Sequence, residues 1–152
     1  MTHFPERSEH SRWMMEGSSA DTQTELELSI VESGIVAGFP SPALDFVDKS
    51  IDLNKHIIKH PSATFYGRVK GDSLKNAGIT DGDLLVIDKS LEPTNGKIAV
   101  CFIDGAFTAK RIKILKDEAF LIPENENYQP IRVDRDNDFM IWGIVTHVIK
   151  KV

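Results

Sequence analysis

One serine stands where its hydroxyl could act as a nucleophile. Ser73 lies in the segment 70–74 (KGDSL), directly after a stretch typical of a β-strand and at the start of a short helical turn. The first N–H groups of such a turn have no acceptor within it and can bind an oxyanion beside the serine hydroxyl. A serine that only caps the turn fits the same position, and the local sequence alone favours that simpler interpretation.

A serine nucleophile also needs a base, and the spacing of the five histidines identifies none. The tetrapeptide 71–74 (GDSL) is similar to the motif of the GDSL hydrolases, which use an Asp-x-x-His pair. No aspartate stands three positions before His56, His60 or His147. The pair is therefore absent, and a histidine base is not indicated.

Lysine is the alternative base, provided that burial keeps it neutral, since its unperturbed pKa is about 10.4. In the expected strand 107–115, Lys110 shares a face with Thr108, Ile112 and Ile114, so it points with apolar residues. A desolvated amine is a suitable general base for a serine hydroxyl. A lysine that extends its ammonium to water from an edge strand fits the same alternation.

Other reactive residue types give weaker signals. His56 and His60 share one helix face, but no glutamate stands between them and no ligand cluster completes a tetrahedral site. We therefore expect two surface histidines, no metal and no cofactor. Cys101 lies in an apolar run and is expected to be a small buried hydrophobe with a raised pKa. Asp81 and Asp83 are expected to be solvated turn residues.

From residue 38 onward, short apolar segments separated by turn residues predict a mainly β fold. The expected strands are 65–70, 83–88, 97–103, 107–115, 119–122, 131–133 and 140–149. The dipeptide 104–105 (DG) is expected to join two of them as a hairpin. One helix is expected over 53–59, stopped by Pro61, and a shorter helical turn over 74–77, ended by Gly78.

Charge is concentrated at the N-terminus. The chain has 152 residues and a formal net charge of −5, and its first 34 residues hold seven acids against two arginines. Few large apolar side chains precede Leu26, so we expect residues 1–24 to be mobile in isolation. Beyond them, Leu26, Leu28 and Ile30 alternate with polar residues and predict a strand that lays one face on its own subunit or on a partner.

The composition also excludes several classes of protein. No apolar run approaches the roughly 18 residues that suggest a membrane span, and no secretory signal is visible. The single cysteine excludes a disulfide-rich scaffold, and the net acidity argues against nucleic-acid binding through a basic surface. These features favour a cytoplasmic protein that has no membrane partner.

Motifs with a consistent order extend from about residue 35 to the C-terminus. They are 38–43 (GFPSPA), 51–54 (IDLN), 60–64 (HPSAT), 71–73 (GDS), 81–85 (DGDLL), 104–105 (DG) with 107–110 (FTAK), 121–123 (LIP) with Asn125, and 142–145 (WGIV). Together they resemble the LexA/UmuD-like family of self-cleaving serine peptidases. The resemblance implies a LexA-like peptidase domain of strongly bent sheets with one or two short helices, preceded by an extended N-terminal arm.

The resemblance also implies roles for particular residues. Ser73 would be the nucleophile and Lys110 its base, which are the two side chains that the residue patterns indicate independently. The backbone N–H groups of Asp72 and Ser73 are then the candidates for the oxyanion hole. The family cuts before a glycine in this part of the arm, which implies a scissile bond between Ala37 and Gly38.

A cut at this bond divides the chain into an acidic arm, 1–37, and a peptidase domain, 38–152. The domain carries 16 acids and 16 bases, so the arm would take the whole formal side-chain excess with it.

The resemblance further implies partners. We expect a homodimer that cuts its own arm when a RecA–single-stranded-DNA filament promotes the reaction during the SOS response. The processed dimer would then serve a UmuC-type Y-family DNA polymerase in error-prone translesion synthesis. The arm is too short and polar for a helix-turn-helix domain, so direct sequence-specific DNA binding is not expected. Two other functions stay open: a non-catalytic adaptor of the polymerase or filament, and a regulator that binds another repressor.

Overall fold

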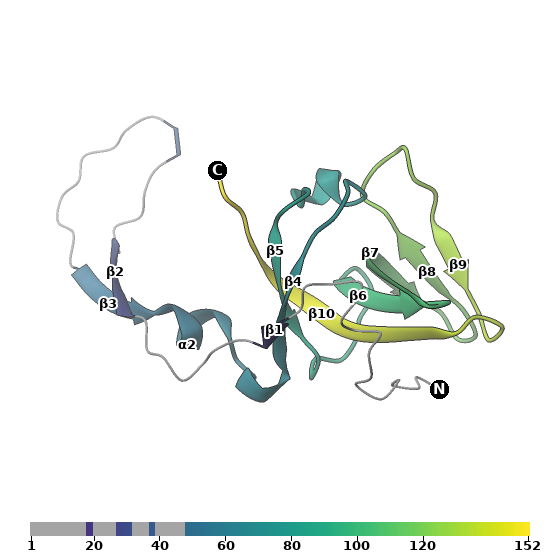
Figure 1. Ribbon diagram of the computed structural model, residues 1–152, viewed down its shortest axis with the longest axis horizontal. Helices are drawn as coiled ribbons and strands as arrows, with labels where there is room; N and C mark the ends of the chain where they lie inside the picture. The colour runs from purple at the N-terminus through teal and green to yellow at the C-terminus, as the bar shows by residue number, and fades with distance from the viewer. Residues whose placement is uncertain (1–17, 20–26, 32–36, 39–47) are drawn as a thin grey trace. The chain divides into compact units, whose positions relative to one another are not determined.

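The structure is a computed structural model that describes residues 18–19, 27–31, 37–38 and 48–152 (Figure 1). The chain forms two compact units, one of Asp21–Pro61 and one of Ser62–Val152 together with Met1–Ala20. Apart from residues 18–19, the segment 1–24 that was expected to be mobile lies outside the described residues. No helix of the described residues is long and apolar enough to cross a membrane.

In the smaller unit, β2 (Glu27–Val31) pairs antiparallel with β3 (Asp48–Asp52), and α2 (Leu53–Ile57) follows β3 directly. The strand predicted near Leu26–Ile30 is thus confirmed as β2. The strand β3 was not predicted, because its residues (DKSID) have little of the apolar character that marks a strand. The Asp52 side chain caps α2 by accepting from the Asn54 N–H at 2.9 Å, and the helix ends two residues earlier than predicted.

The larger unit is built on one antiparallel sheet of eight strands in the order β1-β4-β5-β10-β6-β7-β8-β9. Its strands are β1 (Ser18–Ser19), β4 (Thr64–Arg68), β5 (Leu84–Asp88), β6 (Ile98–Ile103), β7 (Ala106–Ile114), β8 (Ala119–Ile122), β9 (Ile131–Val133) and β10 (Phe139–Ile149). All seven strands predicted between residues 65 and 149 are present. The two-residue strand β1, which pairs with β4, was not predicted.

The long strand β10 joins two halves of this sheet. Its residues 139–144 pair with β6, whereas its residues 144–149 pair with β5, and register shifts lie between Ile141 and Gly143 and between Val145 and His147. Bulges of this kind bend a strand and increase its twist. In Figure 1, β10 is the long yellow strand that runs from beside β6 to beside β5. The predicted fold class, mainly β with strongly bent sheets and short helices, is confirmed.

The two faces of β6 contribute to two hydrophobic cores. Ala99 and Cys101 pack with residues of β7, β8, β9 and β10, including Ile112 and Leu121. Val100 packs on the other side in a cluster that includes Leu74, Leu85 and Ile87. Leu74 follows the candidate nucleophile directly and is 2% exposed, so the core anchors the turn that carries Ser73.

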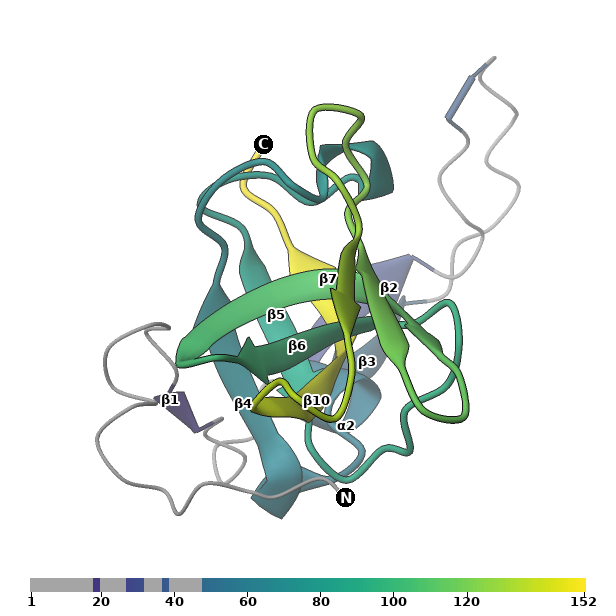
Figure 2. The same cartoon turned by 90° about the vertical axis from the view of Figure 1, so that its right-hand side faces the viewer.

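The hairpin between β6 and β7 sets the register of the candidate base. Asp104 and Gly105 have φ values of 46° and 89°, which are the two positive angles of a type I′ turn. This register places Lys110 opposite Ala99, on the β7 face that also carries the buried Ile112. Figure 2 shows β7 as a long curved strand between β6 and β8. The hairpin predicted at Asp104-Gly105 is confirmed.

Gly143 of β10 packs against the end of β5. A Cβ atom at this position would lie 2.6 Å from Ile87 Cγ2, and Ile87 is fully buried. We therefore expect Gly143→Ala to lower the free energy of unfolding by about 1–3 kcal/mol, measured by urea denaturation. In an Ile87→Ala background the clashing methyl group is gone, and the same substitution is expected to cost much less. Equal costs in the two backgrounds would contradict this packing account.

Candidate active site

The structure brings Ser73 and Lys110 into direct contact, although they lie 37 residues apart in the sequence. The distance from Lys110 Nζ to Ser73 Oγ is 3.0 Å. Two further contacts hold the amine in place, at 2.7 Å to Thr108 Oγ1 and at 3.2 Å to the Ala109 carbonyl. The lysine lies in the interior of β7, and the serine lies in the turn before the short 3-10 helix η2 (Lys75–Ala77).

Burial lowers the pKa of Lys110 below its ordinary value of 10.5, because the protonated amine loses its hydration in a side chain that is 8% exposed. A negative charge on the nearby Cys101 would oppose this shift. Burial, however, raises the pKa of the Cys101 thiol to about 12, so the thiol is neutral near physiological pH. Among the described residues, no carboxylate forms an ion pair with Lys110. The site therefore favours the neutral amine.

The turn 71–74, which we call the nucleophile turn, is held at both ends. Gly71 has a φ of 88°, and its N–H donates to Asp81 Oδ1 at 2.7 Å. At the other end, η2 begins after Leu74 and ends at the left-handed Gly78, as predicted. The N-cap of η2 is Leu74, and no side chain caps this helix. Ser73 is therefore not used as a capping residue, and its hydroxyl contacts the lysine instead.

Two carbonyl groups of this turn are bound by neighbouring segments, whereas three of its N–H groups have no partner among the described residues. The Asp72 carbonyl accepts from the Lys75 N–H and from Asn125 Nδ2, and the Ser73 carbonyl accepts from the Glu124 N–H. Across the described part of the chain, no hydrogen bond uses the N–H of Asp72, Ser73 or Leu74. The first two are the groups proposed for an oxyanion hole, and they have the unused donors that such a hole requires.

A cleft of about 140 Å³ opens beside the two side chains. Besides Ser73 and Lys110, its lining comprises Arg68, Val69, Lys70, Leu74, Leu85, Phe107, Thr108 and Ala109. A cavity of roughly 150 Å³ holds a molecule about the size of benzene. The cleft therefore has room for one small or medium side chain next to the serine hydroxyl.

The structure also describes the other residues singled out in the sequence. Ala37 and Gly38 are both exposed and belong to the unit Asp21–Pro61. His56 and His60 are exposed, and no group of three potential metal ligands occurs among the described residues. Cys101 is a free, fully buried cysteine with a raised pKa, as predicted.

The expectation that Asp83 is a solvated turn residue is wrong. Asp83 is 5% exposed, and its carboxylate accepts from Lys150 Nζ at 2.6 Å and from the Thr80 N–H at 2.8 Å. Burial alone would raise its pKa, but these hydrogen bonds and the charge of Lys150 hold the pKa below its usual value. The partner lysine lies 67 residues away, so local sequence could not indicate the pair. The Asp83 carbonyl also accepts from the Val69 N–H, near the start of the nucleophile turn.

Sequence reasoning missed the residues that contact the nucleophile turn from the segment after β8. Asn125 is 4% exposed and donates to the Asp72 carbonyl at 2.9 Å, and Tyr128 donates to Asp72 Oδ1 at 2.8 Å. The one available signal was the family motif 121–123 with Asn125, which indicated no role for the asparagine. An asparagine in a polar loop gives no local indication that it is buried.

Comparison with known proteins identifies the family. The model of the Peptidase S24-like family matches residues 29–146. Protein MucA of Salmonella typhimurium is 42% identical over 114 residues, which cover 74% of this chain and 77% of MucA. Protein SamA of S. typhimurium strain LT2 is 43% identical over 115 residues, covering 76% of this chain and 79% of SamA.

The similarity extends to a repressor. The LexA repressor of Shewanella denitrificans is 37% identical over 131 residues, which cover 86% of this chain and 63% of the repressor. The resemblance to the LexA/UmuD-like family that was inferred from the motifs is thereby confirmed. From the fold, the contact between Ser73 and Lys110 and these relatives, we conclude that the chain belongs to the Peptidase S24-like family.

Proposed function

We propose that this protein is a serine peptidase that cuts its own chain between Ala37 and Gly38, with Ser73 as nucleophile and Lys110 as base. One observation carries the proposal: Lys110 Nζ lies 3.0 Å from Ser73 Oγ at a position where burial lowers the lysine pKa. Membership of the Peptidase S24-like family supports the same class of reaction. A non-catalytic adaptor would have no use for a costly buried lysine beside a serine hydroxyl.

The contacts of Lys110 suit the role of a base. A neutral amine has two hydrogens and one lone pair. The Ala109 carbonyl can only accept, and Thr108 Oγ1 can also accept, so these two groups can take both hydrogens. The lone pair is then available to the Ser73 hydroxyl, which donates its proton to Nζ as the reaction begins.

The reaction then follows from general acid–base and nucleophilic catalysis. Ser73 Oγ attacks the Ala37 carbonyl, and the N–H groups of Asp72 and Ser73 bind the oxygen that becomes negative. The protonated Lys110 returns its proton to the Gly38 nitrogen as the peptide bond breaks. Water then hydrolyses the ester between Ala37 and Ser73, with neutral Lys110 again acting as base.

The proposed cleavage site suits such a reaction. Ala37 and Gly38 are exposed and small, so the segment can adopt the extended shape that a narrow cleft requires. Tethering of the arm to the enzyme replaces binding of a separate substrate and supplies a high effective concentration.

We further propose a place for this reaction in the SOS response. The similarity to MucA, SamA and the LexA repressor supports a UmuD-like mutagenesis protein whose cleavage is promoted by a RecA–single-stranded-DNA filament. In this proposal the processed form is a cytoplasmic homodimer that serves as accessory subunit of a UmuC-type Y-family polymerase. Loss of the arm also removes the −5 net charge and so changes the electrostatic surface offered to partners.

Replacement of either proposed active-site side chain is expected to abolish cleavage. The wild-type protein, incubated with RecA filament and followed by intact mass and N-terminal sequencing, should yield a fragment that begins at Gly38. Ser73→Ala and Lys110→Ala should yield none, because each removes one member of the nucleophile and base pair. Lys113→Ala, an exposed lysine on the opposite face of the same strand, is the matched control and should cleave normally. A Gly38 fragment from either active-site variant would refute the assignment.

The pH dependence of cleavage provides a second test. Only neutral Lys110 can act as base, so below its pKa the rate without filament should rise about tenfold per pH unit. Because burial lowers the pKa of Lys110, the rate should reach its plateau below the ordinary value of 10.5. A rate independent of pH, or one still rising above 10.5, would exclude the desolvated lysine as base.

A further inference from the structure

The segment 123–128, which follows β8, lies against the nucleophile turn. Its backbone makes two contacts there: the Glu124 N–H donates to the Ser73 carbonyl at 2.8 Å, and the Glu124 carbonyl accepts from the Asn76 N–H at 2.8 Å. Its side chains add contacts to Asp72 from Asn125 and Tyr128. The nucleophile turn therefore has a second support besides Asp81.

Asn125 is the buried member of this support, and its amide has partners on both sides. Asn125 Nδ2 donates to the Asp72 carbonyl at 2.9 Å, while Oδ1 accepts from the Asn127 N–H at 2.9 Å. The side chain is 4% exposed. The Asp72 carbonyl requires a donor and the Asn127 N–H requires an acceptor, so the amide can face only one way and is held rigidly.

The geometry of the peptide bond transmits this constraint to Ser73. The Asp72 carbonyl and the Ser73 N–H belong to one planar trans peptide unit, so they point in opposite directions. A donor that holds the carbonyl therefore determines where the N–H points. That N–H has no partner within the described residues and is one of the two proposed oxyanion donors.

We propose that Asn125 is a positioning residue that aims the Ser73 N–H at the developing oxyanion by binding the Asp72 carbonyl. The inference rests on the proposed function, since it assigns a role within the same site. It differs from a purely structural role because it predicts a loss of reaction rate without a change in the pKa of Lys110.

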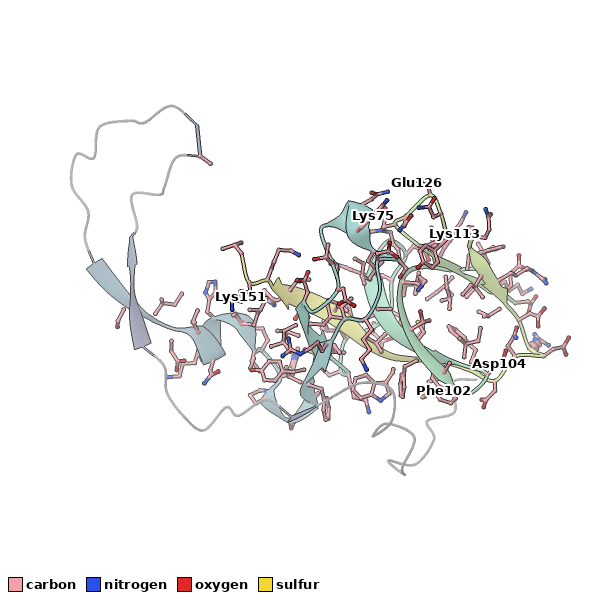
Figure 3. The ribbon with its side chains drawn as sticks, turned by 45° about the horizontal axis from the view of Figure 1, so that its top comes forward. Lys75, Phe102, Asp104, Lys113, Glu126 and Lys151 are labelled. Atoms are coloured by element: carbon pink, nitrogen blue, oxygen red, sulfur yellow. The ribbon has the colours of Figure 1, made fainter. Side chains whose placement is uncertain are left out.

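The segment 123–128 also makes contacts through charged side chains, which are less buried than Asn125. Glu126 pairs with Lys75 at 3.4 Å and accepts from Asn76 Nδ2 at 3.0 Å, while Glu124 pairs with Arg111, the residue after Lys110. Figure 3 shows Lys75 and Glu126 close together at the surface, away from Phe102 and Asp104. These pairs are exposed or half-buried and contribute little individually, so the buried amide provides the stronger constraint.

The direct test is Asn125→Asp. This change keeps the side-chain volume and the acceptor for the Asn127 N–H, but at alkaline pH the carboxylate has no hydrogen to donate to the Asp72 carbonyl. Self-cleavage without filament, measured across the alkaline pH range, should reach a plateau rate about 100-fold below that of the wild type. The midpoint of the pH profile is measured in Asn125→Leu, which removes the donor at similar volume without adding a charge near Lys110, and it should be unchanged.

Asn137→Ala is the matched control. Asn137 has the same kind of contacts in a different turn: its Nδ2 donates to Asp104 Oδ2 at 3.0 Å, and its Oδ1 accepts from the Asp134 N–H at 3.0 Å. This variant should cleave at the wild-type rate. Thermal melts of both variants would show how far each is destabilised, and Asn125→Ala should reproduce the slow cleavage of Asn125→Asp if it folds.

Two results would overturn the inference. One is a wild-type plateau rate in Asn125→Asp, and the other is a pH midpoint in the uncharged Asn125→Leu that moves up toward 10.5, which would indicate a general loosening around Lys110. Labelling of Ser73 by a small fluorophosphonate, whose phosphoryl oxygen takes the oxyanion position, keeps the two proposals separate. If the wild type labels but does not cut itself, the proposed function fails, and slower labelling of Asn125→Asp still tests the role of Asn125.

Discussion

The site depends on one costly arrangement, an amine buried in a β-sheet beside a serine hydroxyl. A protonated lysine loses most of its hydration at this depth, and no carboxylate among the described residues compensates for the loss. The protein lowers this cost by shifting the equilibrium toward the neutral amine. The contacts with Thr108 and Ala109 hold that amine without providing a negative charge that would favour its protonation. Burial, which opposes a charged lysine, is thus what makes Lys110 suitable as a base.

The remainder of the larger unit serves to hold the two side chains at this distance. The type I′ hairpin at Asp104 and Gly105 sets the register that turns Lys110 toward the buried face. Ser73 comes from a turn without regular structure of its own, so it needs external supports. Leu74 anchors the turn in a core, while Asp81 and Asn125 bind its backbone from separate segments. A nucleophile on a short turn is positioned well only where long-range contacts restrict that turn.

Local patterns were sufficient to predict the central strands, and they made Lys110 a candidate base beside the alternative of a lysine that extends to water. Alternation along residues 107–115 indicated that Lys110 faces the core, and the Asp-Gly dipeptide indicated the hairpin before it. The spacing of residues could not show that Ser73 meets Lys110, because that contact depends on how a turn and a strand 37 residues apart come together. It became a specific expectation only through the resemblance to a family.

The missed features share a physical reason. The burial of Asp83 depends on Lys150, and the position of Asn125 depends on the nucleophile turn, so neither has a local signature. The strand β3 lacks an apolar alternation, and the division of β10 between β6 and β5 results from bulges in a uniformly apolar run. Tertiary contacts determine all of these features. The missed residues Asp83 and Asn125 support the site rather than form it.

The central claim is that Lys110 is desolvated enough to be neutral at a pH where an exposed lysine is charged. An NMR titration of the Lys110 side chain tests this directly, with Ser73→Ala used to prevent cleavage and Lys110→Ala used to assign the signal. The account predicts a single titration with a midpoint clearly below the ordinary value of 10.5. A midpoint at 10.5 or above would contradict it, since the amine would then be protonated and unable to accept the Ser73 proton.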